Sequence, residues 1–197
     1  MKYKVIAIAG KAGSGKDALL KGVLGQNPNL HEIISCTTRP KRDNEEEGVN
    51  YYYLTSRQLA DKILANEMLE TTCFNGWYYG TPISSLNPDK INVGVFNPAG
   101  ITELAYNDNI DLVIIYVKAS DKIRLTRQLN REVNPNVKEI VRRFSTDEED
   151  FKNFEEKFNP IHLDNEVWED YGYCVNEILD VVYLVETGQI EYNKFHV

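Results

Sequence analysis

The sequence has few cysteines and no long apolar run. Its three cysteines, Cys36, Cys73 and Cys174, are widely separated and include no C-x-x-C pair. This pattern is typical of buried thiols in a reducing cytosol rather than of a disulfide framework or a zinc site. No apolar segment approaches the ~20 residues of a membrane-spanning helix, and the first residues lack the layout of a signal peptide. We therefore expect a cytoplasmic protein with no membrane partner.

Positive charge is also scarce. The 197 residues include 22 Lys and Arg against 30 Asp and Glu, which gives a formal net charge of −8. A sequence-independent binder of nucleic-acid polymers needs a net basic surface, so we expect no such partner. The basic residues nevertheless gather at Lys16, Arg39–Arg42 and Arg124–Arg143. That distribution is compatible with a cationic pocket for small phosphate compounds.

Apolar runs and helical patterns alternate along the chain. Short apolar runs at Val5–Ala9, Ile91–Phe96 and Leu112–Val117 predict buried strands. A helical pattern at Asp17–Leu24 follows the first run, and another that begins at Ser120 follows the third run. Because parallel strands need helical crossovers, the alternation predicts an α/β fold with a mostly parallel sheet flanked by helices.

The segment Ile33–Pro82 differs in character, being rich in Thr, Tyr, Arg and Glu. Thr55 with Gln58 three residues later forms a capping box, which predicts a helix that buries Leu59, Ile63 and Leu64. We expect this segment to be an inserted lobe and the Arg-rich stretch to be a mobile lid. Further helices are predicted at Val137–Phe151 and Val181–Val185. The predicted division is a core (residues 1–32, 86–123 and 144–197), an inserted lobe (33–85) and a lid (124–143).

The most specific motif is a glycine-rich loop between the first predicted strand and helix. Gly10–Asp17 reads G-K-A-G-S-G-K-D and matches G-x-x-x-x-G-K, in which backbone N–H groups surround a phosphate. The helix N-terminus adds partial positive charge, and Lys16 can reach the outer phosphates. A glycine-rich turn with a surface lysine is the alternative, which the strand and helix on either side disfavour. The predicted ATP-binding residues of this P-loop are Ala12, Gly13, Ser14, Gly15, Lys16 and Asp17.

Asp17 stands where this motif usually has Ser or Thr. The hydroxyl at that position normally ligates Mg²⁺, and a carboxylate is also a hard oxygen ligand. An Asp in the first turn of a helix is equally favoured by the helix dipole. Both interpretations of Asp17, metal ligand and helix cap, remain open.

A second polar block follows in the predicted lobe. Ser35–Arg42 reads S-C-T-T-R-P-K-R, and Glu45, Gly48 and Tyr51 come next. Arginines bind phosphate in a bidentate manner, and a tyrosine hydroxyl adds a donor. Ordinary core packing is the alternative for the tyrosines.

A third block completes a family resemblance. Glu70 is followed by Gly76–Thr81, which reads G-W-Y-Y-G-T. Together with the P-loop and the Ser35–Arg42 block, in this order and spacing, the sequence resembles the guanylate kinases over residues 4–176. The resemblance implies a P-loop core with a monophosphate-binding lobe and a lid. It also implies Mg²⁺-dependent transfer of a phosphoryl group from ATP to GMP or dGMP.

The resemblance further implies roles for lobe residues. The role of Glu70 in reading the base has a physical basis. Guanine presents N1–H and N2–H₂ side by side to one carboxylate, whereas adenine would leave the carboxylate unpaired. In isolation, Glu70 would be a solvated carboxylate at a helix end. The implied phosphate-binding residues are Arg39, Arg42, Tyr51 and Tyr79, and the implied residues at the base are Ser35, Glu70, Thr81 and Asn97.

The predicted lid is rich in arginine. Arg124, Arg127 and Arg131 share one face of a predicted helix, and Arg142 and Arg143 follow after a turn. They form either a solvated basic face or a lid that places arginines over the transferring group, since phosphoryl transfer needs positioning and charge neutralisation. The resemblance implies a catalytic set of Lys16, Arg39, Arg127, Arg131 and Arg143, with Asn176 near the adenine of ATP.

The sequence departs from the family at one acidic pair. The family carries Asp-x-Asp before a glycine, and alignment on Gly100 places Val95 and Asn97 at those positions. A carboxylate is therefore missing there and gained at Asp17, and we hypothesise that the two changes compensate. Asn97 still offers a carbonyl and an amide. The acidic stretch Thr146–Asp170 is either a surface elaboration or a dimer contact.

Two other functions stay open. A kinase with broader specificity for deoxynucleoside monophosphates shares the P-loop without needing Glu70. A catalytically inactive guanylate-kinase-like domain binds a protein partner in the cleft. The intact Lys16 and the arginines of the lid favour an enzyme over such a binding domain. The expected partners are ATP and GMP or dGMP, and the expected state is a monomer or homodimer.

Overall fold

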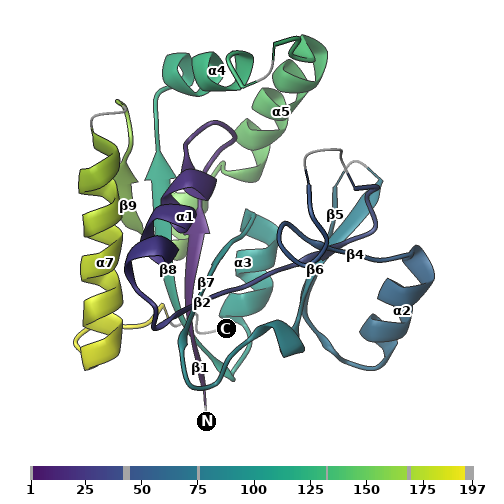
Figure 1. Cartoon of the computed structure of the whole chain (residues 1–197), viewed down its shortest axis with the longest axis vertical. Helices are drawn as coiled ribbons and strands as arrows, with labels where there is room; N and C mark the ends of the chain where they lie inside the picture. The colour runs from purple at the N-terminus through teal and green to yellow at the C-terminus, as the bar shows by residue number, and fades with distance from the viewer. Residues whose placement is uncertain (1, 42–44, 75, 132, 168–169, 194–197) are drawn as a thin grey trace.

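The chain forms two β-sheets, and helices cover both faces of the larger one (Figure 1). The computed structural model describes residues 2–41, 45–74, 76–131, 133–167 and 170–193. None of the helices in these ranges is long and apolar enough to cross a membrane. Cys36 and Cys174 are buried free thiols, as expected, whereas Cys73 is exposed.

The larger sheet is parallel, with the strand order β2-β7-β1-β8-β9. The central strand β1 pairs with β7 on one side and with β8 on the other. The three predicted strands are therefore the middle of the sheet, and the predicted α/β fold is confirmed. The strands are β1 (Tyr3–Ala9), β2 (Leu30–Glu32), β7 (Ile91–Val95), β8 (Ile110–Lys118) and β9 (Ile161–Asp164).

Alternate side chains of β1 supply two separate cores, because successive strand residues point to opposite faces. Ile6 and Ile8 pack in one core under helices α1 and α7. Val5 and Ala7 pack in the other, under α3 and α6. The helices are α1 (Lys16–Gln26), α3 (Pro98–Ala105), α6 (Phe154–Phe158) and α7 (Tyr171–Thr187).

The smaller sheet lies within the predicted lobe and has the order β4-β3-β6-β5. The capping box before helix α2 is confirmed, because Thr55 and Gln58 bond each other's backbone N–H groups. Leu59 is buried as predicted, but Ile63 and Leu64 are 42% and 82% exposed, so their predicted burial was wrong. The elements are β3 (Cys36–Thr37), β4 (Tyr52–Tyr53), α2 (Ser56–Leu64), β5 (Met68–Phe74), β6 (Trp77–Pro82) and the short helix η1 (Ile83–Ser85).

Two helices lie beyond the carboxyl end of β8 (Figure 1). They are α4 (Asp121–Leu129) and α5 (Val137–Asp150), and they pack against each other. The predicted helices after Ser120 and at Val137–Phe151 are thus confirmed. Helix α7 begins at Tyr171, well before the predicted Val181. Helix α5 also contacts the P-loop, because Asp147 accepts from the backbone N–H of Ala12.

Candidate active site

A cavity of about 290 Å³ lies where the P-loop, the smaller sheet, the end of β7 and the end of α5 meet. The structure thus brings together segments that are far apart in the sequence. The cavity is lined by Gly10, Ala12 and Lys16; by Ser35, Tyr51, Glu70, Thr72 and Tyr79; by Val95, Phe96, Asn97 and Pro98; and by Arg143, Asp147, Asp150 and Phe151.

The P-loop requires glycine for two physical reasons. Gly13 and Gly15 have φ values of +84° and +96°, which side chains on other residues rarely allow. A Cβ at Gly13 would also collide with the backbone of Arg124, and one at Gly15 with the side chain of Asn165. Helix α1 begins at Lys16, so its unpaired N–H groups and its positive dipole end are at the loop. This geometry is suited to binding an anion.

Lys16 and Asp17 lie at the start of α1. The Lys16 side chain lines the cavity and is 18% exposed, whereas Asp17 is 75% exposed. The Lys16 Nζ and Asp17 Oδ2 atoms are 3.9 Å apart. Burial, then the neighbouring Tyr79 and the charge of Asp17, raise the pKa of Tyr51. Asp17 therefore acts electrostatically on the lobe side of the cavity while staying open to solvent.

Arg39 is held by a carboxylate beside the cavity. Its Nη2 atom is 2.7 Å and 3.0 Å from the two carboxylate oxygens of Glu45. Tyr53 donates to the same carboxylate at 2.8 Å. The guanidinium carbon lies 5.7 Å from the ring centre of Tyr51, which is 5.9 Å from that of Tyr79. Glu45 thus fixes Arg39 next to two tyrosines that line the cavity; Arg42 lies outside the described residues.

Ser35 and Glu70 line one wall of the cavity, and buried Thr81 joins them in a hydrogen-bonded row. The hydroxyls of Ser35 and Thr81 are 3.0 Å apart, and Thr81 Oγ1 donates to Glu70 Oε1 at 2.7 Å. Glu70 is only 6% exposed. Burial raises the pKa of Glu70 to about 7, although the Thr81 hydrogen bond opposes the shift. The structure therefore brings together three of the residues that the resemblance places at the base.

Asn97 caps a helix at the same wall of the cavity. Its Oδ1 accepts from the N–H of Gly100 at 2.7 Å and so caps helix α3. Its Nδ2 donates to Thr72 Oγ1 at 3.2 Å, which ties the start of α3 to strand β5. Val95 lines the cavity nearby and supplies no charge there. Sequence reasoning missed Thr72, which carries no motif signal.

Two carboxylates of α5 also line the cavity, although Val95 supplies no charge at its own position. Arg143, Asp147 and Asp150 lie at spacings of four and three residues, on one face of the helix, and all three line the cavity. Burial and the charge of Asp147 raise the pKa of Asp150. The start of the acidic stretch therefore belongs to the cavity, not only to the surface. The helical spacing from Arg143 was the available signal.

The arginines of the lid occupy different places. Arg143 Nε is 3.0 Å from Glu139 Oε1, and Arg142 binds the same carboxylate, so these bonds lower the pKa of Glu139 to about 2. Arg127 Nη1 donates to backbone carbonyls of the P-loop and, at 2.9 Å, to that of Asn165. Arg131 is exposed just past the end of α4. Of these, Arg143 lines the cavity.

The asparagine beside the P-loop is Asn165. It is 5% exposed and its Nδ2 donates to the carbonyl of Ser14 at 2.7 Å. Asn176 instead is exposed on α7 and is not among the residues that line the cavity. Asn165 follows strand β9, which sequence reasoning did not predict. The implied contact of Asn176 with adenine stays a prediction.

Comparisons with known proteins match this architecture. The family model described as guanylate kinase matches residues 2–181. Curated relatives named guanylate kinase include those of Prochlorococcus marinus (strain MIT 9312), 44% identical over 91 residues, and of Thermotoga maritima, 37% identical over 94 residues. These matches cover 46% and 48% of this chain and 49% and 45% of the relatives. The chain therefore spans about half the length of these curated relatives.

A solved structure extends the likeness to most of the fold. It is the crystal structure of guanylate kinase from Anaplasma phagocytophilum, with a TM-score of 0.59 and 20% sequence identity. The match covers 93% of this chain and 86% of that chain. At this identity the likeness is one of fold.

Proposed function

The chain belongs to the guanylate kinase family, and on that premise we propose that it transfers the γ-phosphoryl group of ATP to GMP or dGMP in the cytoplasm. The observation that carries the proposal is that Lys16 of the P-loop and the buried Glu70 line the same cavity. One side of the cavity suits the phosphates of a donor nucleotide, and the other suits a guanine base.

The donor side is built from the P-loop. We assign ATP phosphates to the backbone N–H groups of Gly13, Gly15, Lys16 and Asp17 and to the Lys16 side chain, at the positive end of α1, while the N–H of Ala12 donates to Asp147. Asn165 holds the loop carbonyl of Ser14 in place. Asn176 remains the residue that the family resemblance assigns to adenine.

The residues present fit a magnesium ion. Mg²⁺ prefers hard oxygen ligands and binds through one or two carboxylates together with substrate phosphates and water. Asp17 offers such a carboxylate, open to solvent beside Lys16. No group of three or more His, Cys, Asp or Glu within the described ranges could hold a metal alone, which agrees with an ion shared with nucleotide phosphates. When bound, the ion neutralises phosphate charge.

The acceptor side lies in the smaller sheet. We assign the GMP phosphate to Arg39, Tyr51 and Tyr79, with Arg42 completing the set that the family resemblance implies. Ionised Glu70 accepts from guanine N1–H and N2–H₂, and Thr81 holds one of its oxygens at 2.7 Å. Ser35 and Asn97 complete this wall.

Transfer then proceeds in line: an oxygen of the acceptor phosphate attacks the γ-phosphorus, and the bond to ADP breaks. The protein supplies positioning and positive charge, not a nucleophile. Arg143 already lines the cavity, whereas Arg131 is exposed and needs movement of the lid to reach it. Lid closure also excludes water that would hydrolyse ATP. The charge-neutralising set is Lys16, Arg39, Arg131 and Arg143, and Arg127, which the family resemblance adds to the catalytic set, donates to carbonyls of the P-loop.

The decisive experiment is an ADP-release assay with GMP, dGMP, dTMP and AMP, with and without Mg²⁺. We expect Mg²⁺-dependent turnover with GMP or dGMP and little with AMP. Equal rates across the panel would instead identify a broad deoxynucleotide kinase. The absence of ATP turnover with bound GMP would identify an inactive interaction domain, which the missing carboxylate at Val95 favours.

A further inference from the structure

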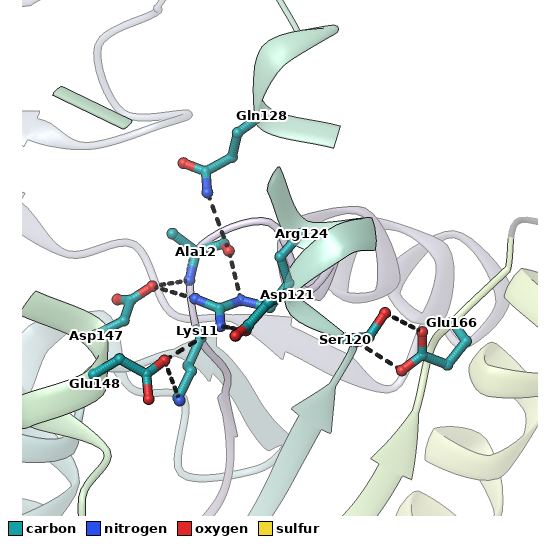
Figure 2. Close-up of polar contacts among 9 residues, drawn as sticks. All are labelled: Lys11, Ala12, Ser120, Asp121, Arg124, Gln128, Asp147, Glu148 and Glu166. Atoms are coloured by element: carbon teal, nitrogen blue, oxygen red, sulfur yellow. Dashed lines mark hydrogen bonds and ion pairs between the residues drawn. The ribbon is translucent and has the colours of Figure 1, made fainter. Parts of the chain in front are cut away.

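Arg124 is a cation buried between the P-loop and helices α4 and α5 (Figure 2). Its side chain is 2% exposed, and its Nη1 and Nη2 atoms lie 2.7 Å from Asp121 Oδ1 and 3.0 Å from Asp147 Oδ2. Its Nε donates to the carbonyl of Ala12 at 3.1 Å. The ring of Phe144 lies 4.3 Å from the guanidinium carbon. Arg124 therefore faces carboxylates and the P-loop, not a transferring phosphate.

Asp147 joins this arginine directly to the P-loop. Its Oδ2 atom, which binds Arg124, also accepts from the backbone N–H of Ala12 at 2.6 Å (Figure 2). The next residue, Glu148, has Oε1 2.6 Å from Lys11 Nζ, and this hydrogen bond lowers the pKa of Glu148. Two successive residues of α5 thus bind two successive residues of the P-loop.

The same turn of α5 carries a residue of the proposed chemistry. Arg143 precedes Asp147 by four residues, so both lie on one face of the helix and both line the cavity. Fixing Asp147 against Ala12 therefore fixes the rotation of α5 about its axis and its position along that axis relative to the P-loop. Both settings determine where Arg143 lies. The contact works in both directions, because it also fixes the backbone of the P-loop at Ala12.

We propose that Arg124, Asp147 and the backbone of Ala12 form a clamp that positions helix α5, and with it Arg143, over the P-loop for phosphoryl transfer. The proposal rests on the proposed kinase activity. Arg124 and Asp147 are positioning residues in it: they act through the loop backbone and Arg143. A displacement of about 1 Å in a reacting arrangement is enough to lower a rate on the order of 100-fold.

The test separates positioning from simple stabilisation. Asp147→Leu removes one carboxylate of Arg124, which keeps Asp121 and Glu148, and Arg124→Met removes the cation that binds Asp147. Each should therefore lower Tm, while the double variant should regain much of the loss. We expect kcat to fall on the order of 100-fold in all three, with KM for GMP unchanged. A double variant that regains both Tm and kcat would show that the clamp only stabilises the fold, and the proposal would be wrong.

Glu166→Gln is the matched control. Glu166 accepts from the N–H of Ser120 at 2.7 Å and from its hydroxyl at 2.8 Å, at the start of the same helix α4 (Figure 2). It is not among the residues that line the cavity. We expect a lower Tm and a kcat within about 2-fold of the unaltered protein.

A readout independent of turnover distinguishes the clamp from the kinase activity. Hydrogen exchange of the Ala12 amide, followed by NMR without nucleotide, should be faster in Asp147→Leu than in the unaltered protein and unchanged in Glu166→Gln. ATP affinity of Asp147→Leu should fall at least ~10-fold. If the unaltered protein shows no turnover, the proposed function is wrong. Hydrogen exchange of the Ala12 amide and ATP affinity would still test the clamp in that case. Unchanged exchange and unchanged ATP affinity would overturn the clamp itself.

Discussion

Replacing Glu70 with Gln tests the base-reading wall most directly. The carboxylate is 6% exposed and already accepts one hydrogen bond from Thr81, so its remaining lone pairs are available to two guanine donors. A carboxamide turns an N–H₂ group toward those donors or toward Thr81. Hydrogen bonds to a charged acceptor contribute roughly 1.5–3 kcal/mol. Loss of one such bond should lower kcat/KM for GMP roughly 10- to 150-fold.

The same variant has a predicted effect on stability, with a definite sign. Burial raises the pKa of Glu70 to about 7, so the folded protein prefers the protonated form more than the unfolded chain does. The stability that the protonated carboxyl contributes is complete below the unfolded pKa of 4.5 and is lost as the pH rises through about 7. At pH 8 the ionised carboxylate costs about 3 kcal/mol relative to a neutral group. Glu70→Gln should therefore raise Tm at pH 8 and change it little at pH 4.

The assays are ADP release with GMP and AMP, and thermal unfolding between pH 4 and pH 8. Ionisation is needed to accept both guanine donors, so KM for GMP should fall as the pH rises through about 7. Glu67→Gln is the control, because Glu67 is an exposed carboxylate just before β5 whose Oε2 lies 3.0 Å from Lys62 Nζ. If Glu70→Gln keeps the full preference for GMP over AMP, Glu70 does not read the base. A Tm difference that is independent of pH would refute the reasoning about the buried carboxyl.

Three further predictions concern the P-loop and the lid. Asp17→Ser should weaken Mg²⁺ dependence and lower kcat if Asp17 compensates for Val95; near-normal turnover and Mg²⁺ dependence in an ADP-release titration would end that idea. Gly13→Ala places a side chain at φ +84° against the backbone of Arg124, so thermal unfolding should show a loss of at least ~2 kcal/mol, and an unchanged Tm would contradict the close approach. Arg131→Ala should lower kcat at least ~100-fold with no change in Tm, because Arg131 is exposed; unchanged kcat would remove it from the transfer step.

Local patterns predicted the centre of the fold well. The runs that became β1 and β8 are apolar throughout because both faces of a parallel sheet are covered. The run that became β7 is interrupted by Asn92, whose buried amide donates to the backbone carbonyls of Lys4 and Asn87. Strand β9 escaped prediction, since Ile161–Asp164 is short and its identity as a strand depends on pairing with β8. Helical period predicted α2 but not the burial of its side chains. Ile63 lies four residues after buried Leu59, on the same face, and is still 42% exposed. Leu64 lies five residues after Leu59, so it points away from that face and is 82% exposed.

The site shows the same division between local and tertiary information. Gly13 and Lys16 belong to a contiguous motif whose chemistry can be predicted from residue type and order, whereas the role of Glu70 came only from the family resemblance. Arg124 and Asp147 belong to no such motif, and their meaning depends on the packing of α4 against α5 beside the P-loop. Sequence alone left Arg124 on a basic helix face. In the structure, Arg124 is buried and forms ion pairs with Asp121 and Asp147.

The placement of carboxylates shows how a chain with a net charge of −8 is compatible with the proposed phosphate site. Acidic side chains fix two of its proposed cations, because Glu45 holds Arg39 and Glu139 holds Arg143. An arginine that is already ordered loses less side-chain entropy when a phosphate arrives, because part of that cost was met in folding. The field of each fixed cation is partly cancelled by its carboxylate, so the backbone N–H groups of the P-loop and Lys16 must provide much of the attraction for the donor phosphates. Net charge therefore says little about this cavity, where the order of the cations matters more than their number.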